Sequence, residues 1–165
     1  MKRQISIDLF DEHEKVNFYT VCFHDEKSEF DKFLDEYDNS KYIDQINLIV
    51  SDIDTIGKKG AFSRDFRQEG KPNDNLCALP SNWVTCKLRV FCLRIAEDIV
   101  ILGNGYEKTK RTYNEIPFAL YYANTLLSVD RLLKRRIANS DVTHYQGLLY
   151  GNVTFTIEDE RPEEE

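Results

Sequence analysis

Several residue types that build common functional sites are scarce in this chain of 165 residues. It has four cysteines without a C-x-x-C pair and three scattered histidines, a spacing that argues against a zinc site. No run approaches the roughly 20 apolar residues of a membrane-spanning helix, and the charged first residues contain no apolar signal-peptide core. We therefore expect no metal, no cofactor and no membrane, a cytoplasmic location, and cysteines that are reduced and semi-buried.

The short motifs of the common enzyme classes are also missing. The sequence contains no P-loop, no dinucleotide-binding fingerprint after a strand, no nucleophile elbow and no H-E-x-x-H. Gly103 and Gly105 are close together, but no third glycine follows at the required spacing, so we expect them to supply positive φ angles at a turn. Acidic residues are plentiful, yet on helix faces they look like ordinary solvating charges.

What is present is the composition of a globular chain with an uneven distribution of charge. Hydrophobic residues make up 41% and charged residues 31%, which predicts a single domain over residues 1–157 and a disordered acidic tail over residues 158–165. The net charge of −7 divides into −8 for residues 1–57, +5 for residues 58–113 and −4 for the remainder. A basic central segment therefore lies between acidic flanks.

Hydrophobic periodicity predicts an α+β fold. Alternating apolar residues indicate strands, and spacings of three and four indicate helices. The strongest strand signal is a pair of apolar runs with a short loop between them, which predicts a hairpin in the centre of the sheet. The predicted strands cover residues 4–10, 16–23, 76–79, 86–95, 98–103 and 152–157, and the predicted helices cover 28–37, 43–56 and 118–137.

Two arginines on the central predicted strand have apolar neighbours. Arg89 and Arg94 are five residues apart, so in a strand their side chains point to opposite faces. An unpaired charge in such surroundings is costly. Each arginine is therefore expected either to form a buried ion pair with a helix carboxylate or to be held for an anionic ligand.

A second set of cations follows the next predicted strand. Lys108, Lys110 and Arg111 lie between Tyr106 and Tyr113. They either solvate the rim of the sheet or form a site, since cations interleaved with aromatic rings suit phosphate contacts combined with base stacking.

The order and motifs of this region resemble the RelE/HigB-like toxins of type II toxin–antitoxin systems. "KLR" (residues 87–89), "CLRI" (92–95), "IVIL" (99–102), "NGYEKT" (104–109) and "NEIPFALYYA" (114–123) follow the family's pattern of strands, basic segment and final helix. The resemblance covers about residues 76–127. It implies a RelE-like twisted, mostly antiparallel sheet with two helices from the N-terminal half packed on it, a C-terminal helix, and here an additional N-terminal strand or hairpin.

The resemblance also implies a function. Family members cleave mRNA on the ribosome without a metal and are neutralised by a cognate antitoxin. It assigns catalytic roles to Arg94, Lys108, Lys110 and Tyr113, and RNA binding to Arg89, Tyr106 and Arg111. Asn104 occupies a position where the family often has a histidine, so a weak or divergent active site is expected. The alternative is a non-catalytic RelE-fold interaction module derived from a mobile element or phage.

Overall fold

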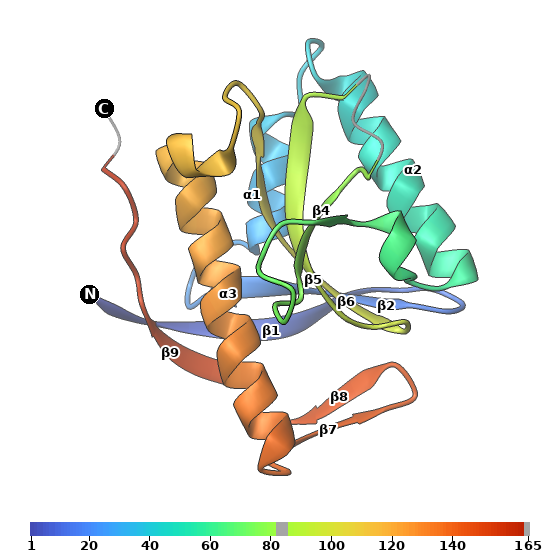
Figure 1. Cartoon of the computed structure of the whole chain (residues 1–165), viewed down its shortest axis with the longest axis vertical. Coiled ribbons are helices and arrows are strands. Elements are labelled where there is room, and N and C mark those ends of the chain that lie inside the picture. The colour runs from blue at the N-terminus through green and yellow to red at the C-terminus, as the bar shows by residue number, and fades with distance from the viewer. Residues whose placement is uncertain (82–85, 164–165) are drawn as a thin grey trace.

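The computed structural model describes residues 1–81 and 86–163 and has an α+β architecture (Figure 1). In this part of the chain, three α-helices pack on a mostly antiparallel sheet of seven strands, and a separate hairpin follows the last helix. The helices are α1 (Glu29–Glu36), α2 (Ile43–Lys59) and α3 (Pro117–Ala138). The strands are β1 (Lys2–Glu12), β2 (Asn17–Phe23), β3 (Arg67–Gln68), β4 (Leu76–Leu79), β5 (Leu88–Ala96), β6 (Ile99–Glu107), β7 (Val142–Tyr145), β8 (Leu148–Gly151) and β9 (Thr154–Glu158).

The sheet has the β5–β6 hairpin near its centre, as predicted. Its strand order is β3-β4-β5-β6-β2-β1-β9, and each neighbouring pair is antiparallel except β2 with β6. The parallel contact runs only from the Asn17–Ile99 pair to the Thr20–Leu102 pair. The second half of β6 therefore extends past its contact with β2.

The first two helices cover one face of the sheet. The Ser28 side chain accepts a hydrogen bond from the backbone N–H of Asp31 and caps the start of α1. Helix α2 is followed by Gly60 at φ 118°, with lysines in its last turn. The apolar stripe of α2 packs against α1 and the sheet through Ile46, Ile49, Ile53 and Ile56.

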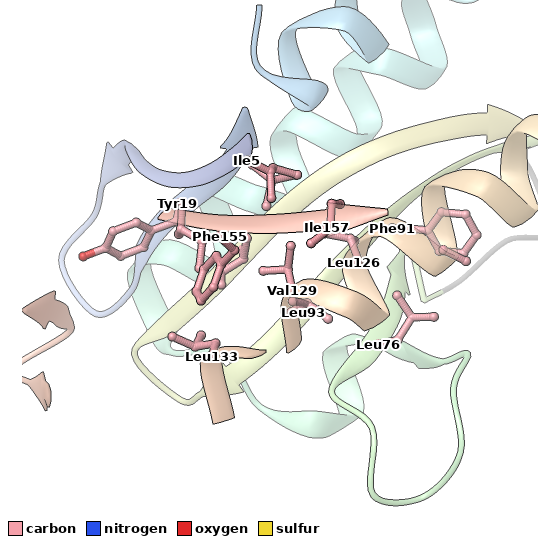
Figure 2. Close-up of a cluster of buried hydrophobic side chains, with 14 of the residues drawn as sticks. Ile5, Tyr19, Leu76, Phe91, Leu93, Leu126, Val129, Leu133, Phe155 and Ile157 are labelled. Carbon is pink, nitrogen blue, oxygen red and sulfur yellow. The ribbon is translucent and has the colours of Figure 1, made fainter. Parts of the chain in front are cut away.

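Helix α3 covers the opposite face. Leu126, Val129 and Leu133 of α3 lie in one buried cluster with Phe91 and Leu93 of β5 (Figure 2). The alternate β5 residues, Leu88, Val90 and Cys92, belong to the cluster beneath α1 and α2. Both faces of β5 are thus covered, which explains its nearly continuous apolar sequence. Among the described residues, no helix combines the length and apolar character needed to cross a membrane.

Gly103 and Gly105 do not form the predicted turn. Both lie inside β6, which continues to Glu107, and neither has a positive φ angle. A Cβ on Gly105 would lie 2.3 Å from the Arg89 carbonyl oxygen and 2.6 Å from Phe33, and one on Gly103 would lie 2.7 Å from Leu126. The turn prediction was wrong because these glycines serve close packing on the two faces of β6 rather than a reversal of the chain.

The β7–β8 hairpin was not predicted from the sequence. Its tight turn uses Gln146 at φ 50° and Gly147 at φ 75°. It projects from the end of α3 (Figure 1), and the Asn17 side chain donates a 2.8 Å hydrogen bond to the Gly147 carbonyl.

After β9, the chain lies against α3 and β1. The Asp159 carboxylate accepts hydrogen bonds from the Tyr121 hydroxyl at 2.5 Å and from Arg3 at 2.7 Å. Arg161 lies 3.4 Å from a Glu26 carboxylate oxygen. Residues 164 and 165 of the predicted tail lie outside the described part of the chain.

Candidate functional site

Arg89 is buried at the centre of the site. It faces Tyr106 across the β5–β6 hairpin, and it is only 2% exposed. Its Nη1 donates hydrogen bonds to the carbonyls of Cys86 at 2.6 Å and Leu88 at 2.8 Å, while its Nε has no hydrogen-bond partner among the described residues. Burial lowers the pKa of the Arg89 guanidinium. No described helix carboxylate forms an ion pair with it, so the expected ion pair with a helix is not observed.

Glu69 supplies the carboxylate of the site. Glu69 directly follows β3, and its backbone N–H donates a 3.1 Å hydrogen bond to the Leu76 carbonyl. One of its carboxylate oxygens lies 3.3 Å from Nε of Arg67. Its side chain is 15% exposed. Burial raises the pKa of Glu69, although the charges of Arg67, Lys108 and Arg89 oppose the shift. A half-buried carboxyl with a raised pKa among cations is typical of a proton-transfer group.

Two tyrosines complete this arrangement. Tyr106 stacks on Phe91 at a centroid distance of 5.3 Å, and Tyr113 meets the same ring edge-on at 5.3 Å. Burial raises the pKa of Tyr106 to about 12 and also raises the pKa of Tyr113. Both phenols are therefore protonated at neutral pH and can donate a proton or hydrogen bond. We call Arg67, Glu69, Arg89, Tyr106 and Tyr113 the Glu69 cluster.

A cationic hollow lies next to the Glu69 cluster at the end of β6. Its volume is about 610 Å³. The Lys108 backbone N–H donates to the Lys87 carbonyl at 2.8 Å, which holds the two lysines on neighbouring strands. The Tyr42 hydroxyl donates a 2.7 Å hydrogen bond to the Glu107 carboxylate. The hollow, which we call the lysine hollow, is lined by Lys41, Tyr42, Gln45, Lys87, Glu107, Lys108 and Thr109.

The structure brings together four of the seven residues that the sequence singled out. Arg89, Tyr106 and Tyr113 belong to the Glu69 cluster, and Lys108 lies between that cluster and the lysine hollow. Lys110 and Arg111 are exposed in the loop after β6. The Lys108 ammonium donates a 3.0 Å hydrogen bond to the Arg111 carbonyl, so this loop folds back on the site.

Arg94 lies apart from this group. It pairs with Val100 near the turn of the β5–β6 hairpin, whereas Leu88 pairs with Glu107 at the other end. Six residues of a strand separate these positions by roughly 20 Å. Arg94 also shares its face with the core beneath α1 and α2, and its Nε donates a 2.7 Å hydrogen bond to the Ala61 carbonyl after α2. In this structure Arg94 fixes the chain that follows α2.

Sequence reasoning missed Arg67, Glu69, Lys41 and Lys87. Arg67 and Glu69 lie between residues 57 and 75, where the sequence predicts neither strand nor helix, and acidic residues resemble ordinary solvating charges. The alternation of Arg67 and Glu69 two residues apart was a weak sign that they share one face. Their proximity to Arg89 depends on the pairing of β3 with β4 and of β4 with β5. A local sequence pattern does not predict which strands pair.

The described residues include no group of three or more histidine, cysteine, aspartate or glutamate side chains arranged to hold a metal ion. All four cysteines are free thiols, and Cys77, Cys86 and Cys92 are buried. Comparison of the chain with protein-family models, with curated proteins and with solved structures gave no significant match.

Proposed function

We propose that this chain is a RelE/HigB-like endoribonuclease that cuts mRNA on the translating ribosome without a metal ion. One support is the order of elements from β2 to α3: a strand, two helices, further strands that end in the β5–β6 hairpin, and a final helix. This is the order that the resemblance implies. The main support is the Glu69 cluster, in which a half-buried carboxyl of raised pKa lies among arginines and protonated tyrosines, with the charge of Lys108 nearby.

The proposed reaction begins at the ribose 2′-hydroxyl. The Glu69 carboxylate accepts its proton, the 2′-oxygen forms a bond to the adjacent phosphorus, and the bond from phosphorus to the 5′-oxygen breaks. The products are a 2′,3′-cyclic phosphate and a 5′-hydroxyl. A carboxylate of raised pKa is a stronger base than an ordinary glutamate, and burial raises the pKa of Glu69.

The cations and a tyrosine act on the phosphate. Arg67 and Lys108 carry positive charge close to Glu69 and would stabilise the negative charge that develops on the phosphate oxygens. Tyr113 is protonated and only half-buried, so it can donate its proton to the departing 5′-oxygen. The proton on Glu69 and the one lost by Tyr113 exchange with solvent after the product leaves. No histidine is required, which accommodates Asn104.

The decisive experiment is cleavage by the purified protein on translating ribosomes programmed with a defined mRNA. We expect cuts that leave 2′,3′-cyclic phosphate ends, that persist in EDTA, and that disappear when the nucleotide at the cut carries a 2′-deoxyribose. Expression should also arrest growth. Cleavage of the deoxy-substituted mRNA, or no cleavage at all, would refute the ribonuclease proposal.

A second candidate function is a non-catalytic interaction module of the same fold. One observation favours it: the Arg89 guanidinium is 2% exposed and donates to two backbone carbonyls, so it presents little of its charge to a substrate. For this candidate, the exposed lysines would hold a protein partner such as a cognate antitoxin. An unmodified protein that binds such a partner but neither cuts mRNA nor slows growth would support it.

A further inference from the structure

A second cavity lies on the other side of Tyr106. It has a volume of about 450 Å³, within the range of small-molecule sites. It forms because β2 pairs with β6 only as far as Leu102, so the edge of β6 from Gly103 onward faces the end of α1 and the start of α3 instead of another strand. In Figure 1 the loop after β6 lies beside these two helices. We call this space the tyrosine cavity.

Four aromatic side chains line this cavity. Tyr37 comes from the end of α1, Tyr106 from β6, and Phe118 and Tyr122 from α3. The Phe118 and Tyr122 rings are 6.0 Å apart and inclined at 45°. Flat rings from three separate elements around one cavity suit a flat heteroaromatic ligand, because every nucleobase can stack on such faces.

The polar groups of the cavity select among flat ligands. Asn104 is 7% exposed, and its side-chain oxygen accepts a 2.7 Å hydrogen bond from the Gly105 backbone N–H. This bond fixes the amide orientation, so the amide NH2 is the donor that remains. Glu36 lies at the exposed side of the cavity and forms no ion pair with any described residue. Lys32 and Glu107 also line the cavity, but Lys32 pairs with Glu26 and Glu29, and Glu107 accepts a hydrogen bond from Tyr42. The Asn104 amide donor and the Glu36 carboxylate are therefore the polar groups left to meet a ligand in this aromatic space.

This pair of groups complements guanine. Guanine carries adjacent N1–H and N2–H donors, which one carboxylate can accept together, and an O6 acceptor for an amide NH2. Adenine has no ring N–H on that edge, and uracil and cytosine offer smaller stacking surfaces.

The cavity also adjoins the lysine hollow. Glu107 and Thr109 line both spaces. A nucleotide whose base enters the tyrosine cavity thus has its phosphates next to Lys108 and Lys87. Tyr106 belongs to the Glu69 cluster as well as to the cavity wall, so base and scissile phosphate would be held by one continuous surface.

We propose that the tyrosine cavity is a guanine-binding subsite that holds one base of the RNA beside the cationic hollow. The inference rests on the proposed function for its substrate class. It can be measured without catalysis, because a mononucleotide can occupy the cavity alone.

The test is calorimetric titration of the purified chain with 3′-GMP, 3′-AMP, 3′-CMP and 3′-UMP. We expect 3′-GMP to bind at least tenfold more tightly than the other three. Glu36→Gln should reduce the preference for 3′-GMP over 3′-AMP by about tenfold or more, as loss of a charged hydrogen-bond acceptor does. Glu36 is exposed, so this change leaves the core intact.

A blocking variant and its control complete the experiment. Thr109→Trp places a large ring at the exposed border of the cavity and should abolish binding, while Thr55→Trp on the exposed face of α2 should not change it. Equal affinity for all four mononucleotides, or 3′-GMP binding that survives Thr109→Trp, would overturn the inference. In either case mRNA cleavage, measured separately, would still decide the proposed function. Binding of 3′-GMP without cleavage would support the subsite and refute the ribonuclease.

Discussion

The two ends of the β5–β6 hairpin each carry an arginine from an apolar strand, but their surroundings differ. At the end formed by Leu88 and Glu107, Arg89 lies near Glu69, Arg67, Lys108 and two tyrosines. At the turn end, Arg94 donates a hydrogen bond to the Ala61 carbonyl. The comparison shows that an arginine on an apolar strand can belong to a cluster of ionisable side chains or can hold a nearby backbone segment through a hydrogen bond. Its role depends on which strands and loops lie at that end of the sheet.

The largest effect should come from the carboxylate of the Glu69 cluster. Glu69→Gln removes the proposed base while keeping its size, and we expect cleavage to fall by about 10²–10⁴-fold. Cleavage of a defined mRNA on translating ribosomes measures the loss. Glu97→Gln, an exposed site at the turn end, is the control and should cut normally. Full activity of Glu69→Gln would contradict the proposal that Glu69 is the base and that this end of the hairpin is the catalytic one.

Lys108 should contribute next. Lys108→Ala removes a cation beside Glu69, and the expected loss in cleavage rate is about 10²–10³-fold, with loss of one transition-state donor as the guide. RNA affinity should depend less steeply on salt, because fewer counterions are released. The control Lys58→Ala removes the same charge from the exposed end of α2. Equal effects of the two variants would indicate a general charge effect and not a site.

The close packing at the Glu107 end can be tested through stability. Gly105→Ala introduces a Cβ that would lie 2.3 Å from the Arg89 carbonyl, so neighbouring backbone must shift. We expect the free energy of unfolding in urea to fall by about 1–3 kcal/mol. Ser51→Ala, on the exposed face of α2, should stay close to the unmodified protein. An unchanged unfolding free energy for Gly105→Ala would show that β6 is less tightly packed here than the structure indicates.

Arg94 should affect stability and not cleavage. Arg94→Lys replaces the guanidinium that donates to the Ala61 carbonyl, and we expect a loss of about 1 kcal/mol in the free energy of unfolding. The cleavage rate should remain unchanged. A tenfold or larger loss of cleavage, with folding intact, would return Arg94 to the phosphate-binding role that the family resemblance implies.

The smallest effect concerns the dependence of stability on pH. Since folding raises the pKa of Glu69 above its ordinary 4.5, this carboxyl stabilises the fold fully below that value and loses its contribution as pH rises through the raised pKa. Glu69→Gln should therefore gain stability relative to the unmodified protein across that interval, as measured by urea unfolding at a series of pH values.

Glu26 provides the opposite case and serves as the comparison. Hydrogen bonds from Arg3 and Lys32 outweigh the burial of Glu26 and lower its pKa to about 2. Its contribution is present above the ordinary 4.5 and is lost as pH falls toward 2. Glu26→Gln should therefore be less stable than the unmodified protein at neutral pH, and this difference should disappear at acidic pH. Parallel pH profiles for the Glu69 and Glu26 variants would contradict the assignment of opposite shifts.

The sequence by itself determined the three helices, most strands of the large sheet and the alternation of side chains along its central strand. In the strand predicted over residues 86–95, Phe91 and Leu93 face one side and Val90 and Cys92 the other, because side chains of a strand alternate whatever its neighbours are. Helical spacing also places Ile46, Ile49, Ile53 and Ile56 of α2 on one face, and all four are buried, whereas Ile43 at the start of the helix is exposed. Local periodicity depends only on residues close in the chain, so it can be read before the fold is known.

Only the tertiary structure decided which charges meet. The charges of Glu69 and Arg89 interact because β3 and β4 add to the edge of β5. The tyrosine cavity exists because β2 pairs with β6 only as far as Leu102. The glycines of β6 are explained by Leu126 and Phe33, which approach from helices on opposite faces. Pairing between distant strands sets these contacts, and a one-residue change in register would alter all of them, so no local sequence pattern contains them.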